Sequence, residues 1–335
     1  MDIIPSYDIE EINLFNYNNE TRNSILSNLK NYIKLEKFKC YGCNLTKLPD
    51  LPSSLSLLNT FNCSNNKLTQ LPKLLNSIIK LKCNDNNLIQ LSDLPNSIIK
   101  LDCSNNNLTE LTHLPKSLTY LYCWKNNLTQ LPNLPNSLIH LDCAYNKLIK
   151  LPDLPNLLTE LHCDDNNNLS KLPDLPNSLI NISCNDNNLS ELPKLPELLI
   201  YLFLANNNLT KLPNLPKSLK EIICYNNNLM ELPELPDLLN TLYCFSNNLI
   251  ELPDLPNTLE YFYCYKNNLT YPNLEIKTIN EINFKNRIIK RMKVLDRNLL
   301  LEWSARISMC PKRIQRLLYN KEIDFYDGSF ETLTY

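Results

Sequence analysis

The sequence predicts a solenoid in which about twelve copies of a roughly 20-residue unit each add one short strand to a continuous parallel sheet. Three ladders of recurring residues support this: one of cysteines, one of asparagines and one of Leu-Pro-x-Leu-Pro segments. The cysteine ladder starts at Cys40, 23 residues before Cys63. From Cys63 on it recurs every 20 residues, with a single interval of 21 and with Leu204 at one position. Its later members are Cys63, Cys83, Cys103, Cys123, Cys143, Cys163, Cys184, Cys224, Cys244 and Cys264.

Each unit shows the alternation of a half-exposed strand. In the fourth unit, Leu101 and Cys103 are expected to point inward, whereas Lys100, Asp102 and Ser104 are expected to point outward. One unit cannot bury its apolar side alone, so neighbouring units must stack and share a core. We expect the cysteines to pack there as reduced, small apolar side chains rather than as metal ligands or disulfides.

The asparagine ladder falls where each strand turns away from the sheet. A buried amide at that point can hydrogen-bond to backbone groups of its own unit and of the next. Cys43 takes this position in the first unit, and the 21-residue unit offers Asn166, Asn167 or Asn168. The other members are Asn66, Asn86, Asn106, Asn126, Asn146, Asn187, Asn207, Asn227, Asn247 and Asn267.

The Leu-Pro-x-Leu-Pro segments, such as Leu131 to Pro135, form the back of each unit. Proline fixes its own φ near −65° and favours extended geometry in the residue before it. A unit of about 20 residues also leaves little room for a helix. The backing is therefore expected to be extended or polyproline-like.

From about residue 35 to residue 273, the units match the pattern L-x-x-L-x-L-x-x-N/C-x-L, with cysteine at the third apolar position. With L-P-x-L-P and N-x-L-T-x-L-P also present, the array resembles the leucine-rich repeats of bacterial secreted effectors. The composition of the repeats, rich in Asn, Ile and Lys, also resembles that of repeat proteins of giant DNA viruses of amoebae. The resemblance implies an α/β-type leucine-rich repeat solenoid, curved and right-handed, whose concave sheet binds a protein such as one of a host.

Three regions are predicted. Residues 1–34 form an N-terminal cap, because Ile25, Leu26, Leu29 and Ile33 share one helical face and resemble the helical cap of the effectors. Residues 35–273 form the repeat array. Residues 274–335 form a helical, basic region, in which residues 277–321 hold twelve Lys or Arg against three acids. This region is expected to cap the last repeat, and its basic face could instead bind nucleic acid or an acidic surface.

Composition excludes several classes of function. The formal net charge is only −2, and Gly42 and Gly328 are the only glycines, so no glycine-rich phosphate loop is present. No apolar run approaches 18 residues, and the start of the chain does not have the pattern of a signal peptide. We therefore expect a cytoplasmic protein with no membrane span and no cofactor, in the cytoplasm of the host cell if the protein is viral.

Catalysis is not predicted. Some of the effectors carry a C-terminal ubiquitin ligase with a catalytic cysteine, but here Cys310 is the only cysteine after the array and no histidine follows His162. On the sheet, His140 should neighbour Glu160, and Asp142 should neighbour His162. These pairs are interpreted as surface ion pairs rather than as a metal site, because a flat sheet rarely lets four ligands converge.

The predicted partner-binding surface is aromatic and lies on the outward face of the sheet, mainly toward its C-terminal end. So many outward aromatic side chains are typical of an interaction site, although they could instead form a ladder that only stiffens the sheet. The early units present mostly lysines. The predicted binding residues are Tyr120, Tyr122, Trp124, Tyr145, Tyr201, Phe203, Tyr225, Tyr243, Phe245, Tyr261, Tyr263 and Tyr265.

Overall fold

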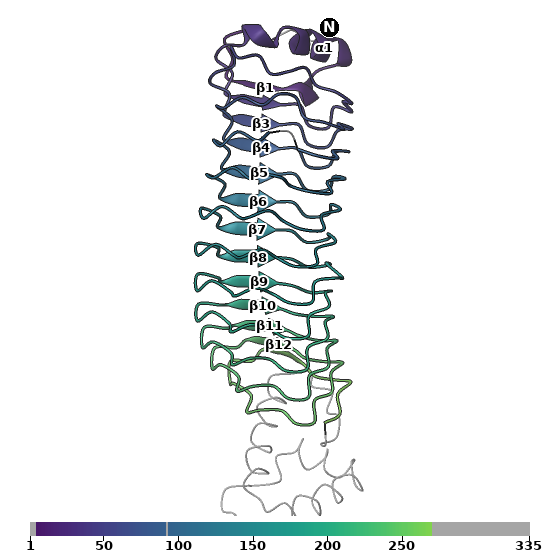
Figure 1. The fold of residues 1–335 in the computed structure, drawn as a ribbon, viewed down its shortest axis with the longest axis vertical. Helices are drawn as coiled ribbons and strands as arrows, with labels where there is room; N and C mark the ends of the chain where they lie inside the picture. The colour runs from purple at the N-terminus through teal and green to yellow at the C-terminus, as the bar shows by residue number, and fades with distance from the viewer. Residues whose placement is uncertain (1–4, 92, 270–335) are drawn as a thin grey trace, which may run out of the picture.

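The structure, a computed structural model, describes residues 5–91 and 93–269. It contains one parallel sheet of thirteen strands, in which each strand pairs with its neighbours in the sequence. Figure 1 shows the strands stacked along the long axis of the molecule. The strands are β1 (Glu11–Asn13), β2 (Lys37–Lys39), β3 (Thr60–Asn62), β4 (Lys80–Lys82), β5 (Lys100–Asp102), β6 (Tyr120–Tyr122), β7 (His140–Asp142), β8 (Glu160–His162), β9 (Asn181–Ser183), β10 (Tyr201–Phe203), β11 (Glu221–Ile223), β12 (Thr241–Tyr243) and β13 (Tyr261–Tyr263).

The strands β2 to β13 correspond to the twelve predicted units, because each ends one residue before a member of the cysteine ladder or Leu204. The parallel solenoid is therefore confirmed. The predicted basic region, residues 274–335, lies outside the described residues.

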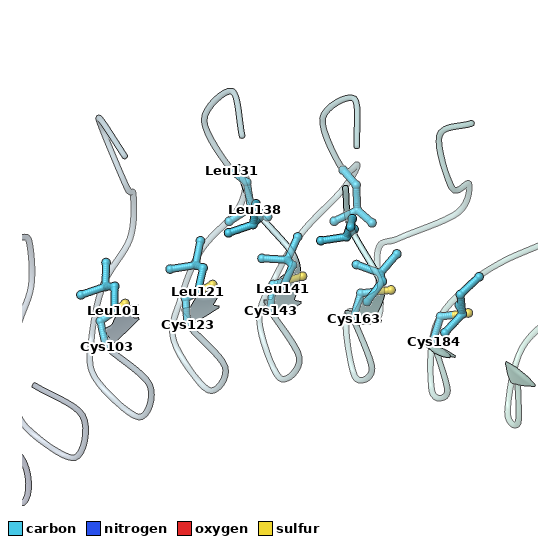
Figure 2. Packing of buried hydrophobic residues seen from close by; sticks show 14 of the residues in the cluster. Leu101, Cys103, Leu121, Cys123, Leu131, Leu138, Leu141, Cys143, Cys163 and Cys184 are labelled. Atoms are coloured by element: carbon cyan, nitrogen blue, oxygen red, sulfur yellow. The ribbon is translucent and has the colours of Figure 1, made fainter. Parts of the chain in front are cut away.

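The core runs without a break along the inner side of the sheet. Leu101 and Cys103 are both fully buried, and the same two positions are buried in the neighbouring units, as Figure 2 shows. Lys100 and Asp102 lie on the outer side, as predicted. The prediction for Ser104 was wrong, because only 1 % of this residue is exposed. Its hydroxyl donates a hydrogen bond to the Asp102 carboxylate (2.8 Å) as the chain leaves the strand.

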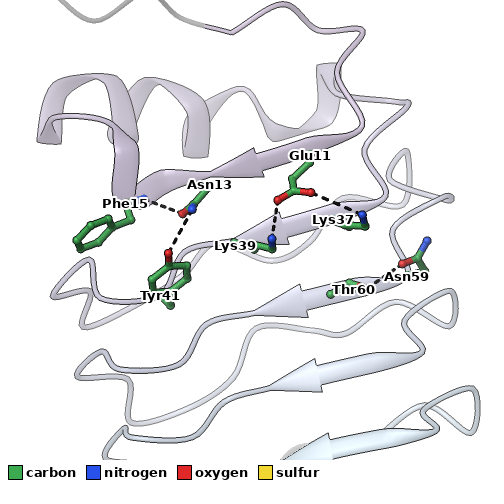
Figure 3. Close-up of polar contacts among 8 residues, drawn as sticks. All are labelled: Glu11, Asn13, Phe15, Lys37, Lys39, Tyr41, Asn59 and Thr60. Carbon is green, nitrogen blue, oxygen red and sulfur yellow. Dashed lines mark hydrogen bonds and ion pairs between the residues drawn. The ribbon is translucent and has the colours of Figure 1, made fainter.

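The sheet extends further toward the N-terminus than the sequence indicated. The predicted helical region includes β1, whose residues pair in register with β2. Figure 3 shows the Glu11 carboxylate on β1 between the ammonium groups of Lys37 and Lys39, at 3.7 and 2.5 Å. The Glu11 carboxylate thus neutralises part of the positive charge of the two lysines at the N-terminal edge of the sheet. The first strand thus comes from outside the predicted repeats.

The helix α1 (Asn19–Ser27) follows β1, preceded and followed by short 3-10 helices at Leu14–Asn16 and Leu29–Asn31. The side chain of Asn18 accepts a hydrogen bond from the backbone N–H of Thr21 and so caps the helix. Ile25 and Leu29 are buried against the core. Ile33, predicted on the same face, is 56 % exposed, because the α-helix ends before this residue.

The backing of each unit is irregular rather than helical within the described residues. A turn follows the second proline: the N–H of Leu118 donates to the carbonyl of Pro115 (3.1 Å), and the N–H of Leu138 donates to that of Pro135 (3.0 Å). This turn brings a leucine back into the core just before the next strand. The expectation of a backing without helices is met.

After each of the strands β3 to β13 the chain turns through one residue with a positive φ, and after β2 it turns through two, Gly42 and Asn44. This conformation is accessible to Asn and Asp at low cost, and Asn or Asp occupies most of these positions. Exceptions include Lys125 (φ 54°), Tyr145 (φ 54°) and Lys266 (φ 53°). In the 21-residue unit, Asn166 keeps the asparagine ladder: it is fully buried, and its amide donates to the carbonyls of Cys143 and Cys163. The additional residue is accommodated in a turn at residues 167–168.

The twelve cysteines within the described residues are free and buried. The ten from Cys63 to Cys264 are therefore expected not to react with a thiol reagent in the native protein, and to react fully once the chain unfolds. Thiol counting with and without denaturant measures this directly. Several disulfides in the native protein, or rapid labelling of the ladder, would contradict the assignment of these cysteines to a reduced core.

Candidate functional site

We define the sheet face as the side chains at the first and third residues of each strand, with the residue that follows the ladder cysteine. It is divided into three zones along the molecule. The N-terminal zone is basic. Lys37 and Lys39 are paired with Glu11, whereas Lys80 and Lys82 are exposed.

The central zone combines aromatic rings with histidines. The Nζ atom of Lys100 lies 5.1 Å from the ring centroids of both Tyr120 and Tyr122, within reach of a cation–π interaction. The Tyr122 ring contacts His140 at 4.6 Å between centroids, and His140 lies 5.5 Å from His162. The zone is thus one connected layer of rings across β6, β7 and β8.

One of the two predicted histidine–carboxylate pairs forms. The Nδ1 atom of His140 lies 2.8 Å from Oε2 of Glu160. Asp142 and His162 are neighbours in register on β7 and β8. Burial raises the pKa of Asp142, opposed by a backbone hydrogen bond from Ala144 and by the two histidines. Within residues 5–91 and 93–269, no three His, Cys, Asp or Glu side chains are arranged to hold a metal ion.

The C-terminal zone, which we call the aromatic zone, covers β10 to β13. Tyr225, Phe245 and Tyr265 form a stacked column, with centroid distances of 4.4 and 4.6 Å and nearly parallel rings. Tyr243 and Tyr263 make an edge contact at 4.9 Å. Successive strands therefore hold these rings at fixed positions.

Much of this aromatic surface stays exposed despite the stacking. Tyr261 is 53 % exposed, Tyr263 45 % and Tyr265 42 %. On β10, Tyr201 and Phe203 lie on the same side of the strand, with ring centroids 6.4 Å apart. The structure thus brings together the predicted aromatic residues of the last four strands on one face.

Tyr145 was predicted to be exposed one strand beyond Tyr120, Tyr122 and Trp124, and it is exposed. It lies at the positive-φ position of its turn and is 56 % exposed at the edge of the sheet. Its exposure comes from the turn that follows β7, because this strand ends at Asp142.

No protein-family model matches the sequence, and no curated protein matches it. The structure, however, is similar to that of YopM from Yersinia enterocolitica WA-314, at 29 % sequence identity and a TM-score of 0.53. The similarity covers 72 % of this chain and 71 % of YopM. The chain is a leucine-rich repeat protein.

Two further solved structures share the fold of this leucine-rich repeat protein. A leucine-rich repeat protein of Leptospira interrogans is 24 % identical, with a TM-score of 0.56, and the match covers 72 % of this chain and 69 % of that one. The functional domain of InlJ from Listeria monocytogenes is 23 % identical, with a TM-score of 0.51, over 72 % of this chain and 65 % of that one. The InlJ domain also includes a cysteine ladder.

Sequence reasoning missed two features of the sheet face of this leucine-rich repeat protein. The contact of Lys100 with two tyrosine rings depends on the register of β5 and β6, which brings Lys100 beside Tyr120. Glu221, on β11, lies beside Tyr201 of β10 and acts electrostatically on Tyr243 of β12. Listing charged residues at outward positions within the aromatic units could have found it.

None of the helices among the described residues has the length and apolar character needed to cross a bilayer. Within its described residues, the repeat array contributes strands and turns only.

Proposed function

We propose that this leucine-rich repeat protein is a non-catalytic interaction module that binds a partner protein through its aromatic zone. The observation that carries the proposal is the exposure of Tyr261, Tyr263 and Tyr265 at the end of the sheet face. Large exposed aromatic patches on folded proteins mark interaction sites, and tyrosine is enriched among the residues that dominate binding energy.

The stacking supports binding as well as stiffness. The column of Tyr225, Phe245 and Tyr265 fixes the rotamers of its rings before any partner arrives. Little side-chain entropy is then lost on association, which favours affinity. The rigid backbone of a repeat array adds to this effect. The free, buried cysteines support a reducing compartment such as the cytoplasm as the place of binding.

The partner can be identified by photocrosslinking. A benzoylphenylalanine placed at Tyr263 is expected to capture a specific protein from an extract of the cells in which the chain acts. The same probe at Lys82, which is also exposed on the sheet face, is the matched control. Capture at residue 82 alone would place the binding surface at the wrong end of the sheet.

With the captured partner, the alanine variants Tyr243→Ala, Phe245→Ala and Tyr263→Ala are each expected to weaken affinity by about 2 kcal/mol or more. Loss of one ring contact should cost about 1 kcal/mol of fold stability at most. Lys80→Ala and Lys82→Ala should change affinity much less. Thermal unfolding and titration calorimetry measure both quantities. Stability loss without affinity loss in the aromatic variants would show that the rings only stiffen the sheet.

A further inference from the structure

One carboxylate lies inside the aromatic zone. Glu221 is the first residue of β11, and its neighbours in register are Tyr201 on β10 and Thr241 on β12. It is the only charged residue at the first and third positions of β10 to β13; the others are Tyr, Phe, Ile or Thr.

The Glu221 carboxylate is partly desolvated. Its side chain is half-buried, and burial raises its pKa. The pKa of Tyr243 is also raised, first by burial and then by Tyr263 and Glu221, which places the carboxylate near this phenol. Lys220, the next residue in the chain, is exposed. Across the described part of the chain, no ion pair includes Glu221.

A half-buried carboxylate without a countercharge is a costly arrangement, and a cation that reaches it removes much of that cost. The surrounding rings act in the same direction. Faces of tyrosine and phenylalanine attract ammonium and guanidinium groups within about 6 Å. The site therefore disfavours an acidic partner by repulsion, and an uncharged partner because the carboxylate would stay unpaired.

We infer that the aromatic zone binds an apolar peptide segment of the partner that carries one arginine or lysine, whose cation pairs with Glu221 beside Tyr201 and Tyr243. This inference rests on the proposed function, since it names the chemistry of the partner at the same surface. Arginine fits best, because its planar group can stack on a ring while it forms two hydrogen bonds with a carboxylate.

The test uses the full chain and a phage-displayed library of random dodecapeptides as the probe. Peptides selected by the wild-type protein are expected to contain one arginine or lysine among aromatic or aliphatic residues. A fluorescent copy of the best peptide should bind Glu221→Gln about tenfold more weakly than the wild type. Glu260→Gln, which changes an exposed carboxylate just before β13, is the matched control and should bind the peptide unchanged.

The variant Tyr243→Ala separates this inference from the proposed function. If Tyr243→Ala abolishes peptide binding but Glu221→Gln does not change it, the aromatic zone binds peptides and the assigned cation pairing is wrong. If neither variant has an effect, or if no peptide is selected, both are wrong. Acidic or uncharged consensus peptides would also overturn the inference. The inference would also be wrong if Tyr243→Ala changed the sedimentation coefficient of the protein measured alone. The aromatic zone would then bind a second copy of this chain rather than a partner peptide.

Discussion

Raising the pH from 9 to 10 is expected to remove most of the stability of the repeat array. The cause is the ladder of buried thiols. Burial raises the pKa of the Cys63 and Cys224 thiols to about 12. Desolvation also raises the pKa of Cys83, Cys123 and Cys244. In the unfolded chain these thiols ionise near their ordinary pKa of about 8.5.

The direction follows from proton binding. In this pH range the folded protein keeps its thiol protons while the unfolded chain loses them, so each unit of pH favours unfolding. The stabilisation from the Cys63 and Cys224 thiols is complete below about pH 8.5 and is lost as the pH rises toward about 12. Each fully buried thiol contributes about 1.4 kcal/mol per pH unit in this window. Nine such thiols together amount to on the order of 10 kcal/mol, comparable to the whole stability of a typical domain. They are Cys40, Cys63, Cys83, Cys103, Cys123, Cys143, Cys163, Cys224 and Cys244.

The measurement is urea unfolding at a series of pH values between 7 and 10 under reducing conditions. The double variant Cys123→Ala and Cys143→Ala is the control, because it removes two titrating groups. Its free energy of unfolding should fall less steeply with pH, by about 2.7 kcal/mol per pH unit. An unchanged slope would show that other groups, such as tyrosines, cause the alkaline unfolding.

The repeat could be predicted because the same residue pattern recurs in twelve units of the sequence. The alternation around Leu101 and the ladder positions reappear in each unit, so the burial pattern of one unit predicts the others. The strand β1 could not be found this way. Glu11–Asn13 lacks the repeat pattern and becomes a strand because it pairs with β2, which is a tertiary effect. The choice of Asn166 was equally hidden, since three identical residues stand side by side in the sequence.

The candidate site was predictable in its location but not in its contacts. The alternation correctly placed Tyr243 and Tyr263 on the outer face. Which rings stack depends on the side-chain geometry between neighbouring strands. That geometry places Phe245 between Tyr225 and Tyr265 in one stacked column. The chemistry of Glu221 depends on desolvation by neighbours more than 15 positions away in sequence, which no single unit reveals.

The asparagine ladder hydrogen-bonds each turn to its neighbours. The amide of Asn106 donates to the carbonyls of Cys83 (3.1 Å), Cys103 (3.0 Å) and Ser104 (3.1 Å). Its carbonyl accepts from the backbone N–H of Leu88 (3.0 Å). One side chain therefore links two consecutive units through four hydrogen bonds, all of them with backbone groups.

Removing the Asn106 side chain affects its backbone hydrogen-bond partners unequally. The Cys83 carbonyl also accepts from Asn86, and the Cys103 carbonyl also accepts from Asn126, so each keeps one partner. The N–H of Leu88 has no such second partner among its described contacts. An unpaired buried N–H costs about 1–3 kcal/mol, to which the loss of the other bonds adds.

Asn106→Ala is accordingly expected to lower the free energy of unfolding by about 3 kcal/mol or more. Asn107→Ala is the matched control. It changes the next residue of the same turn, whose side chain is exposed and whose backbone N–H bonds to the carbonyl of Leu88 in either case. That change should stay within about 0.5 kcal/mol. Urea unfolding of both variants at pH 7 makes the comparison. Equal losses would mean that the cost reflects the general preference of asparagine over alanine in turns rather than the buried hydrogen bonds. A loss confined to Asn106→Ala would show that the hydrogen bonds of the asparagine ladder stabilise the packing of one unit on the next.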